Sequence, residues 1–246
     1  MSVLVVIPAR YASVRFPGKP LATLQGKPMI QHVYEGASQA SGVDEVVVAT
    51  DDERIVHAVA KFGGKAAMTS PTARSGTDRV AEVARTRNAQ VVINIQGDEP
   101  LVRGEMIAQL AQFLTRHTAV PMASLMTPFR PEEDLNSPNV VKVVVDRDKF
   151  ALYFSRSPIP HVRAQGGTPT RFMKHLGFYG YQRHFLLQLP SLEPTPLEQA
   201  EQLEQLRALE HGYRIKLLET VHDSVGVDTP GDLKRVEAML LHGSVR

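Results

Sequence analysis

Three cationic side chains follow an apolar segment near the start of the chain. Val3–Pro8 is almost wholly apolar, and Arg10, Arg15 and Lys19 lie in the stretch that comes after it. An apolar run without polar alternation is typical of a strand covered on both faces in a parallel sheet. Such sheets bind ligands beyond the carboxyl ends of their strands, so the stretch predicts a polyphosphate site. The alternative is a solvated basic loop.

Two common phosphate-binding motifs are absent here. A Walker A loop has serine or threonine after its Gly-Lys pair, whereas Gly18-Lys19 is followed by Pro20. No Gly-x-Gly-x-x-Gly dinucleotide motif follows a predicted strand. The Gly-Lys-Pro tripeptide recurs at 26–28, where it predicts a turn before a helix.

Carboxylates at two distant points of the chain could hold a metal ion. Asp98 follows the apolar strand predicted at 90–96. Mg²⁺ takes few carboxylates and completes its shell with water and phosphate oxygens. Asp98 and Glu99 could instead be turn residues. For Asp228 alone, support of a helix that starts at 229–230 is the better interpretation.

A donor-rich segment, 74–79, precedes another predicted helix. Its backbone groups and the side chains of Arg74 and Ser75 could recognise a nucleobase. An ordinary helix cap by Thr77 or Asp78 explains the same residues equally well.

A further set of polar residues suits a small acidic molecule. His175, Tyr179 and Tyr181 share one face of a predicted strand, as in a sugar-acid site. A partly exposed sheet face is the commoner explanation of such a stripe. Arg156 could bind a carboxylate through two hydrogen bonds, yet a lone arginine is usually a surface residue.

A predicted helix near the end of the chain has Glu201, Glu204 and Gln205 opposite a leucine stripe. Charges in that position are normally solvated. The pattern itself does not make them catalytic, and no nucleophile motif supports covalent catalysis.

The order of the expected elements predicts an α/β fold with a mostly parallel central sheet flanked by helices. The middle of the chain predicts added antiparallel strands. Strands are expected at Val3–Pro8, 45–50, 65–69, 90–96, 122–129, 140–146, 149–154, 172–181 and 214–221. Helices are expected at 29–40, 53–62, 78–87, 105–116, 197–211 and Pro230–Leu241.

Composition limits the class of protein. The chain has 246 residues, which predicts a single domain, 1–246. A formal net charge of +2 does not suit a non-specific nucleic-acid binder. The absence of cysteine excludes disulfides, thiolate catalysis and cysteine-based zinc sites. No secretion signal or membrane-length apolar run is seen, so a cytoplasmic protein without a membrane partner is expected.

Nine segments, in order along the whole chain, resemble one enzyme family, the 3-deoxy-manno-octulosonate (KDO) cytidylyltransferases or CMP-KDO synthetases. The segments are IPARYASVRFPGKPL, VVVATDDERI, SGTDR, NIQGDEPL, NVVKVV, YFSRSPIP, KHLGFYGY, LEQLRALEHG and GVDTPGDL. The resemblance implies a nucleotide-diphospho-sugar transferase fold, Rossmann-like with a small antiparallel insertion. It also implies transfer of CMP from CTP to the anomeric hydroxyl of KDO for lipopolysaccharide synthesis, with release of pyrophosphate and a requirement for Mg²⁺.

The resemblance also assigns roles to residues. Contacts with CTP are assigned to Ala9, Arg10, Ser13, Lys19, Arg74, Ser75 and Gly76. Mg²⁺ is assigned to Asp98 and Asp228, which reverses the interpretation of Asp228 given above. Contacts with the sugar are assigned to Gln96, Arg156, His175, Tyr179, Glu204 and Gln205. Arg10, Lys19, Asp98 and Asp228 form the expected catalytic set; Arg15 receives no role.

Other functions stay open at this point. The enzyme could act on another acidic sugar, such as an 8-amino-KDO analogue or a sialic acid, or the chain could be a catalytically silent nucleotide-binding protein. A glycosyltransferase is less favoured, because no Asp-x-Asp follows a strand and 146–148 is the closest imitation. The resemblance and the unusual middle region imply a homodimer, with a substrate or dimerisation element at about 146–182.

Overall fold

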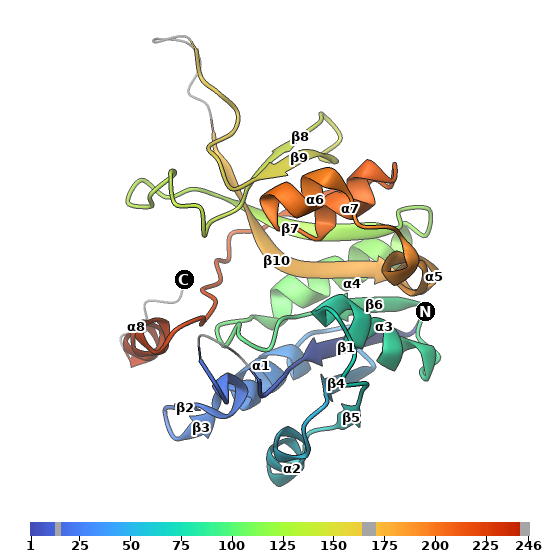
Figure 1. Ribbon diagram of the computed structural model, residues 1–246, viewed down its shortest axis with the longest axis vertical. Coiled ribbons are helices and arrows are strands. Elements are labelled where there is room, and N and C mark those ends of the chain that lie inside the picture. Colours follow the sequence, from blue (N-terminus) through green and yellow to red (C-terminus); the bar gives the residue numbers. More distant parts are fainter. Residues whose placement is uncertain (13–15, 164–170, 242–246) are drawn as a thin grey trace.

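The computed structural model describes residues 1–12, 16–163 and 171–241. Within them, nine strands form one sheet at the centre of the molecule (Figure 1). The strands are β1 (Val3–Pro8), β4 (Glu45–Thr50), β5 (Ala66–Met68), β6 (Val91–Asn94), β7 (Met122–Pro128), β8 (Lys142–Val145), β9 (Ala151–Ser155), β10 (Met173–Gln182) and β11 (Ile215–Glu219). Their order is β11-β7-β10-β6-β1-β4-β5, with β8 against β10 and β9 against β8.

The sheet is parallel on one side and mixed on the other. Strand β1 pairs in parallel with β4 and β6, and β4 pairs in parallel with β5. Strand β10 runs antiparallel between β6 and β7, while β7 and β11 are parallel. Strands β8 and β9 add the small antiparallel part. The predicted α/β class is confirmed, although the central place of β10 does not follow from the alternation of elements in the sequence.

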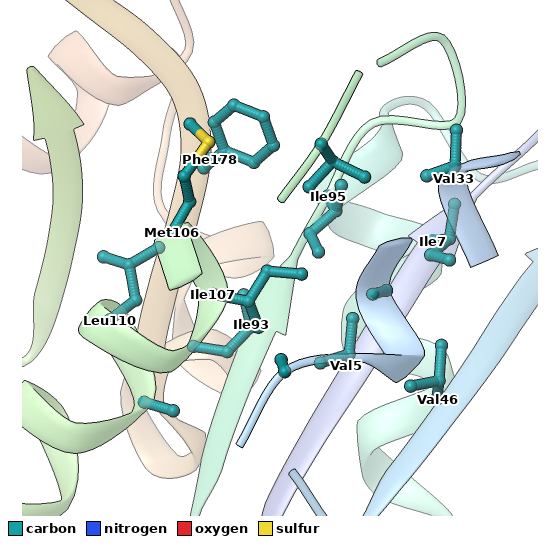
Figure 2. Close-up of a cluster of buried hydrophobic side chains, with 14 of the residues drawn as sticks. Val5, Ile7, Val33, Val46, Ile93, Ile95, Met106, Ile107, Leu110 and Phe178 are labelled. Atoms are coloured by element: carbon teal, nitrogen blue, oxygen red, sulfur yellow. The ribbon is translucent and has the colours of Figure 1, made fainter. Parts of the chain in front are cut away.

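Helices cover both faces of this sheet, since side chains of each strand alternate between two cores. Val5 and Ile7 of β1 face α1, α2 and α4, and Figure 2 shows Val5 towards Ile93 of β6 and Ile7 beside Val33 of α1. Leu4 and Val6 face the opposite core, with α3, α5 and α7. The helices are α1 (Met29–Ser38), α2 (Glu53–Lys61), α3 (Gly76–Arg85), α4 (Gly104–Arg116), α5 (Arg183–Gln188), α6 (Pro196–Glu201), α7 (Gln205–Glu210) and α8 (Pro230–Leu241). None of them, in the part of the chain that the structure describes, is long and apolar enough to cross a membrane.

A third, smaller core joins the two ends of the chain. The turn expected at 26–28 is part of a hairpin, β2 (Thr23–Leu24) and β3 (Lys27–Pro28), whose two turn residues have positive φ angles of 48° and 78°. Leu24 of this hairpin packs with Val227 and with Val236 of α8. Figure 1 shows α8 beside the hairpin, although the two lie at opposite ends of the sequence.

The single helix expected at 197–211 is wrong. Two short helices, α6 and α7, take its place because Gln202 adopts a left-handed conformation, with a φ of 53°, and ends α6. The turn points two carboxylates in different directions. Glu201 reaches Ser155 of β9, and Glu204 reaches the start of α3. No glycine marks this break in the sequence.

Candidate active site

A cavity of about 250 Å³ opens at the carboxyl edge of the parallel strands. It lies where β1 and β6 end, beside the start of α3 and the segment before α8. This is the edge at which open parallel sheets bind ligands. Its lining is mostly polar and includes eight of the predicted residues: Ala9, Arg10, Lys19, Ser75, Gly76, Gln96, Asp98 and Asp228.

Lys19 lies between the two aspartates of the cavity. Its Nζ atom is 2.6 Å from Oδ2 of Asp98 and 3.3 Å from Oδ1 of Asp228. The lysine side chain is only 13% exposed, so solvent screens these contacts less than it screens a surface ion pair. Asp98 and Asp228 therefore meet at a single ammonium group, although they are 79 and 209 positions away from Lys19 in the sequence.

Backbone contacts bring together the end of β1, the segment of Asp98 and the segment of Asp228. The Val227 N–H donates to the Asp98 carbonyl at 2.9 Å, which fixes the segment of Asp228 beside that of Asp98. Gly97 approaches the end of β1 so closely that a Cβ there would lie 2.9 Å from the Pro8 carbonyl oxygen. Thr229 caps α8: its Oγ1 accepts from the Asp232 N–H, and the Asp232 carboxylate accepts from the Thr229 N–H.

The start of α3 forms another wall of the cavity. Ser75, rather than Thr77 or Asp78, is the helix cap, because its Oγ accepts from the Asp78 N–H. The Ser75 hydroxyl donates to one oxygen of Glu204 at 2.9 Å, and the Thr77 hydroxyl donates to the other at 2.6 Å. A carboxylate predicted on α7 is thus held by the hydroxyls of the loop predicted to face the nucleotide.

Two arginines of this region behave differently from what their positions in the sequence suggest. The guanidinium of Arg74 donates to Asp78 and to the Pro190 carbonyl, and Arg74 lines a neighbouring cavity instead of the first. Arg79, which the sequence analysis did not select, is 4% exposed and lines the first cavity. It donates to Asp51 at the end of β4. The signal for Arg79 was its place in the SGTDR segment.

The predicted aromatic stripe is present on β10. The rings of His175 and Tyr179 lie 5.3 Å apart, and those of Tyr179 and Tyr181 lie 6.2 Å apart in a stacked arrangement. The pairing of β10 with β7 shifts between Leu176 and Tyr179, an irregularity that strand alternation does not predict. Burial lowers the pKa of His175 to about 3 and raises the pKa of Tyr179, so both side chains are neutral at pH 7.

Arg156 and Gln205 complete the predicted set. The guanidinium of Arg156 donates to the carbonyl oxygens of Glu201, Pro138 and Gln202, at 2.7, 2.8 and 3.2 Å. These bonds fasten the α6–α7 turn to the end of β9. Gln205 is 6% exposed at the start of α7. Ser13, predicted to contact the nucleotide, lies outside the described residues, as does Arg15.

The donor set of the cavity fits a hard divalent cation. Asp98 and Asp228 both point at the position of the Lys19 ammonium, so they converge on one place. Burial and the charge of Asp98 raise the pKa of Glu99 to about 8, which keeps the neighbouring carboxyl largely protonated at pH 7. No group of three or more His, Asp or Glu side chains within the described residues could hold a metal. Two carboxylates, with water and phosphate oxygens as the other ligands, are a typical set for Mg²⁺.

Comparison with known proteins decides the family. The sequence model of the cytidylyltransferase family matches residues 4–216. The chain belongs to this family. It is 52% identical over 245 residues to the 3-deoxy-manno-octulosonate cytidylyltransferase of Geotalea uraniireducens, covering 96% of this chain and 98% of the relative. It is 53% identical to the protein of that name from Geotalea daltonii, covering 96% and 97%.

A similarity to a solved structure points to the same family. The structure of CMP:2-keto-3-deoxy-manno-octonic acid synthetase complexed with CTP matches with a TM-score of 0.93 and 47% sequence identity. The match covers 99% of this chain and 100% of the other. The family expected from the nine segments is therefore confirmed, and the cavity at the ends of β1 and β6 belongs to a cytidylyltransferase.

Proposed function

We propose that this cytidylyltransferase transfers CMP from CTP to the anomeric hydroxyl of KDO, with release of pyrophosphate, and so supplies CMP-KDO for lipopolysaccharide synthesis. The observation that carries the proposal is the whole-length similarity to a CMP-KDO synthetase complexed with CTP, at 47% identity. Curated relatives of the same length, 52% and 53% identical, are named for the same activity.

The nucleotide half of the proposed site is the cavity at the carboxyl edge. Ala9, Arg10, Ser13 and Lys19 hold the triphosphate of CTP, while Ser75 and Gly76 face the cytidine. The narrow space at Gly76 supports this role, because a Cβ there would lie 3.3 Å from the Pro8 side chain and 3.4 Å from that of Gln96. Arg74 belongs to the same loop. To reach the nucleotide, its side chain has to break its hydrogen bonds to Asp78 and to the Pro190 carbonyl.

Asp98 and Asp228 are the proposed magnesium ligands. The ion, when bound, neutralises phosphate charge and promotes ionisation of the attacking hydroxyl. Lys19 serves as the counter-ion of both carboxylates and remains beside the phosphates as a compact point charge.

The sugar half of the proposed site lies towards β10 and α7. Gln96, His175 and Tyr179 contact the sugar acid from the sheet, and Glu204 and Gln205 contact it from α7. Arg156 supports this half by holding the α6–α7 turn, and it is the proposed partner of the sugar carboxylate. Glu204 links the two halves, since it accepts hydrogen bonds from Ser75 and Thr77.

The charges explain how the reaction can proceed without a covalent enzyme intermediate. A hydroxyl that attacks the α-phosphate meets negative charge, and the departing pyrophosphate gains more. At about 4 Å and an effective dielectric of 20, one unit-charge contact contributes roughly 4 kcal/mol. With Arg10 and Lys19 as the proposed phosphate contacts, positioning and charge neutralisation would supply most of the catalysis.

The assembly and the location remain proposals of the same kind. We propose a homodimer formed through the element at 146–182, where Leu152 and Val162 are 63% and 48% exposed. A cytoplasmic location and a single domain are part of the same proposal.

The test is a coupled assay of pyrophosphate release. Purified protein is given CTP and Mg²⁺ with KDO, with a sialic acid, with an 8-amino-KDO analogue or with no sugar. We expect rapid release with KDO and slower release with the other acids. Faster release with another acid would reassign the substrate. CTP binding without release in any mixture would overturn the proposal in favour of a silent nucleotide-binding protein.

A further inference from the structure

We infer that Ser124 is a positioning residue that fixes which ring nitrogen of His175 holds the proton, leaving Nδ1 as a hydrogen-bond acceptor. The statement about the ring stands on the geometry of β7 and β10. Its meaning for the substrate rests on the proposed function.

The Ser124 hydroxyl lies among three polar atoms of β10. Ser124 is fully buried in β7. Its Oγ lies 2.7 Å from the Phe178 carbonyl oxygen, 3.2 Å from that of Leu176 and 2.8 Å from Nε2 of His175. One hydroxyl therefore meets two carbonyls and one imidazole nitrogen.

The single proton of the Ser124 hydroxyl decides the direction of its contact with His175. A serine hydroxyl has a single proton to donate, and a carbonyl oxygen can only accept. The shortest contact, to Phe178, takes that proton. Because Oγ has then nothing left to donate, its contact with Nε2 is a hydrogen bond only if Nε2 bears a proton. His175 must donate to Ser124.

An irregular pairing of β7 and β10 keeps these groups together. The partner of β10 on β7 changes from Leu125 to Ser124 while β10 advances from Leu176 to Tyr179. The irregularity turns the carbonyls of Leu176 and Phe178 towards the same hydroxyl. Both carbonyls are buried there, and a buried carbonyl without a donor is costly, so Ser124 satisfies the irregularity and sets the ring at the same time.

The imidazole ring of His175 lies among aromatic side chains. Phe154 meets it edge-on at 4.9 Å, and Tyr179 lies 5.3 Å away on the same stripe. Burial among these rings lowers the pKa of His175 to about 3, so the imidazole is neutral and holds one proton. With that proton on Nε2, Nδ1 carries no proton and can only accept a hydrogen bond.

In the proposed sugar site, a bare Nδ1 accepts a hydrogen bond from a hydroxyl and repels a carboxylate. His175 therefore recognises a hydroxyl-bearing edge of the sugar acid. The carboxylate of the substrate has to face a cation elsewhere in the site.

The ring state can be measured on the wild-type protein without substrate. Long-range ¹H–¹⁵N correlation spectra at neutral pH distinguish the two tautomers of each of the nine histidines, and the spectrum of His175→Gln identifies the signal of interest. We expect the neutral tautomer with the proton on Nε2. A proton on Nδ1, or a protonated ring, would overturn the inference whatever the enzyme does.

Variants then connect the hydroxyl to the ring. In Ser124→Ala we expect the tautomers to mix and the KM for the sugar acid to rise roughly tenfold, with little change for CTP, as fits the loss of one oriented hydrogen bond. Ser124→Thr keeps the hydroxyl and should restore both readouts. Thr127→Val is the matched control, since it removes another buried hydroxyl of β7, from a residue that pairs with Lys174.

The two proposals fail in different ways. If Ser124→Ala leaves the tautomer of His175 unchanged, the inference is wrong even when CMP transfer to KDO is confirmed. If no sugar acid reacts but the tautomer responds as expected, the proposed function fails and the role of Ser124 stands. If Ser124→Ala does not fold, the wild-type tautomer and the spectrum of Ser124→Thr decide the question.

Discussion

At the scale of single residues, opposite charges from distant parts of the chain meet at Lys19. Asp98 is the closer of its two carboxylates, at 2.6 Å, and lies four residues beyond the end of β6. The lysine ammonium already occupies the place where the two carboxylates converge. If a metal–triphosphate complex binds as proposed, it would share these oxygens with Lys19, so small changes of charge here should affect turnover strongly.

The first prediction concerns Asp98→Asn. The substitution keeps the shape but removes the charge, so we expect kcat/KM to fall by at least about 100-fold while the fold is kept. Pyrophosphate release, measured over a series of Mg²⁺ concentrations, checks it. Glu132→Gln, which neutralises an exposed carboxylate, is the control. Unchanged turnover would remove Asp98 from the proposed metal site.

The second prediction concerns the pH dependence of stability. The pKa of His175 is lowered to about 3 in the folded protein, whereas an unfolded histidine titrates near pH 6.5. As the pH falls below 6.5, the unfolded chain takes up a proton that the folded protein refuses, so stability decreases. His175→Gln lacks this effect.

The measurement is urea unfolding of both proteins at pH 7 and pH 5. Between these pH values we expect the wild-type protein to lose about 1–2 kcal/mol more than His175→Gln does. Equal losses in the two proteins would show that the folded ring is accessible to protons, against the burial seen in the structure.

Some of the site residues could be predicted from the sequence and others could not. Lys19 and Asp98 follow apolar strands, and the strand rule places both at one edge. Asp228 needed the family resemblance, because its local sequence indicates only a helix start. Ser124 has no local signal, since its role arises from an irregular pairing of two strands.

At the scale of elements, the break between α6 and α7 determines which way two carboxylates point. The sequence 197–211 has the leucine stripe of one helix, and periodicity alone therefore predicts one helix. The tertiary contacts of Glu201 with Ser155 and of Glu204 with Ser75 favour the turn instead. Tertiary contacts outweigh helix propensity here.

The third prediction tests that turn. Gln202 has a φ of 53°, a region in which glycine is favoured and a β-branched residue is strained. Gln202→Val should lower the free energy of unfolding by about 1–2 kcal/mol, while Gln202→Gly should change it by less than about 1 kcal/mol. Chemical denaturation checks both. Equal effects of valine and glycine would contradict the left-handed turn.

At the scale of the whole molecule, β10 joins segments that are far apart in the sequence. Lys174 of β10 is 5% exposed and forms ion pairs with Glu133 and with Asp223. Asp223 lies in the segment that runs towards Asp228. A buried cation thus holds the middle loop and the approach to the site against the sheet.

The fourth prediction follows from this cation. Lys174→Met removes the buried cation that two partly buried carboxylates share and leaves Asp223 only its longer pair with Arg130, so we expect a loss of stability of roughly 3 kcal/mol. Lys61→Met, at the exposed end of α2, is the control and should have little effect. Thermal or urea unfolding measures both. A loss no larger than that of the control would show that the pairs with Lys174 contribute little.

The topology could be predicted only in part. The parallel half of the sheet follows from alternating strands and helices, because each crossover returns the chain in the same direction. The antiparallel place of β10 depends on long-range pairing after two intervening strands, β8 and β9. Alternation along the chain holds no information about that choice.

The small core that joins the β2–β3 hairpin to α8 has a consequence for the order in which the protein matures. Val227 and Val236 come after every strand of the sheet in the sequence, and they hold the segment of Asp228 against the first fifth of the chain. The sheet and most of the cavity lining can therefore form in a nascent chain that still lacks the carboxylate of Asp228. If Asp228 has the proposed role, the site is complete only after this segment has been made and has docked on the hairpin.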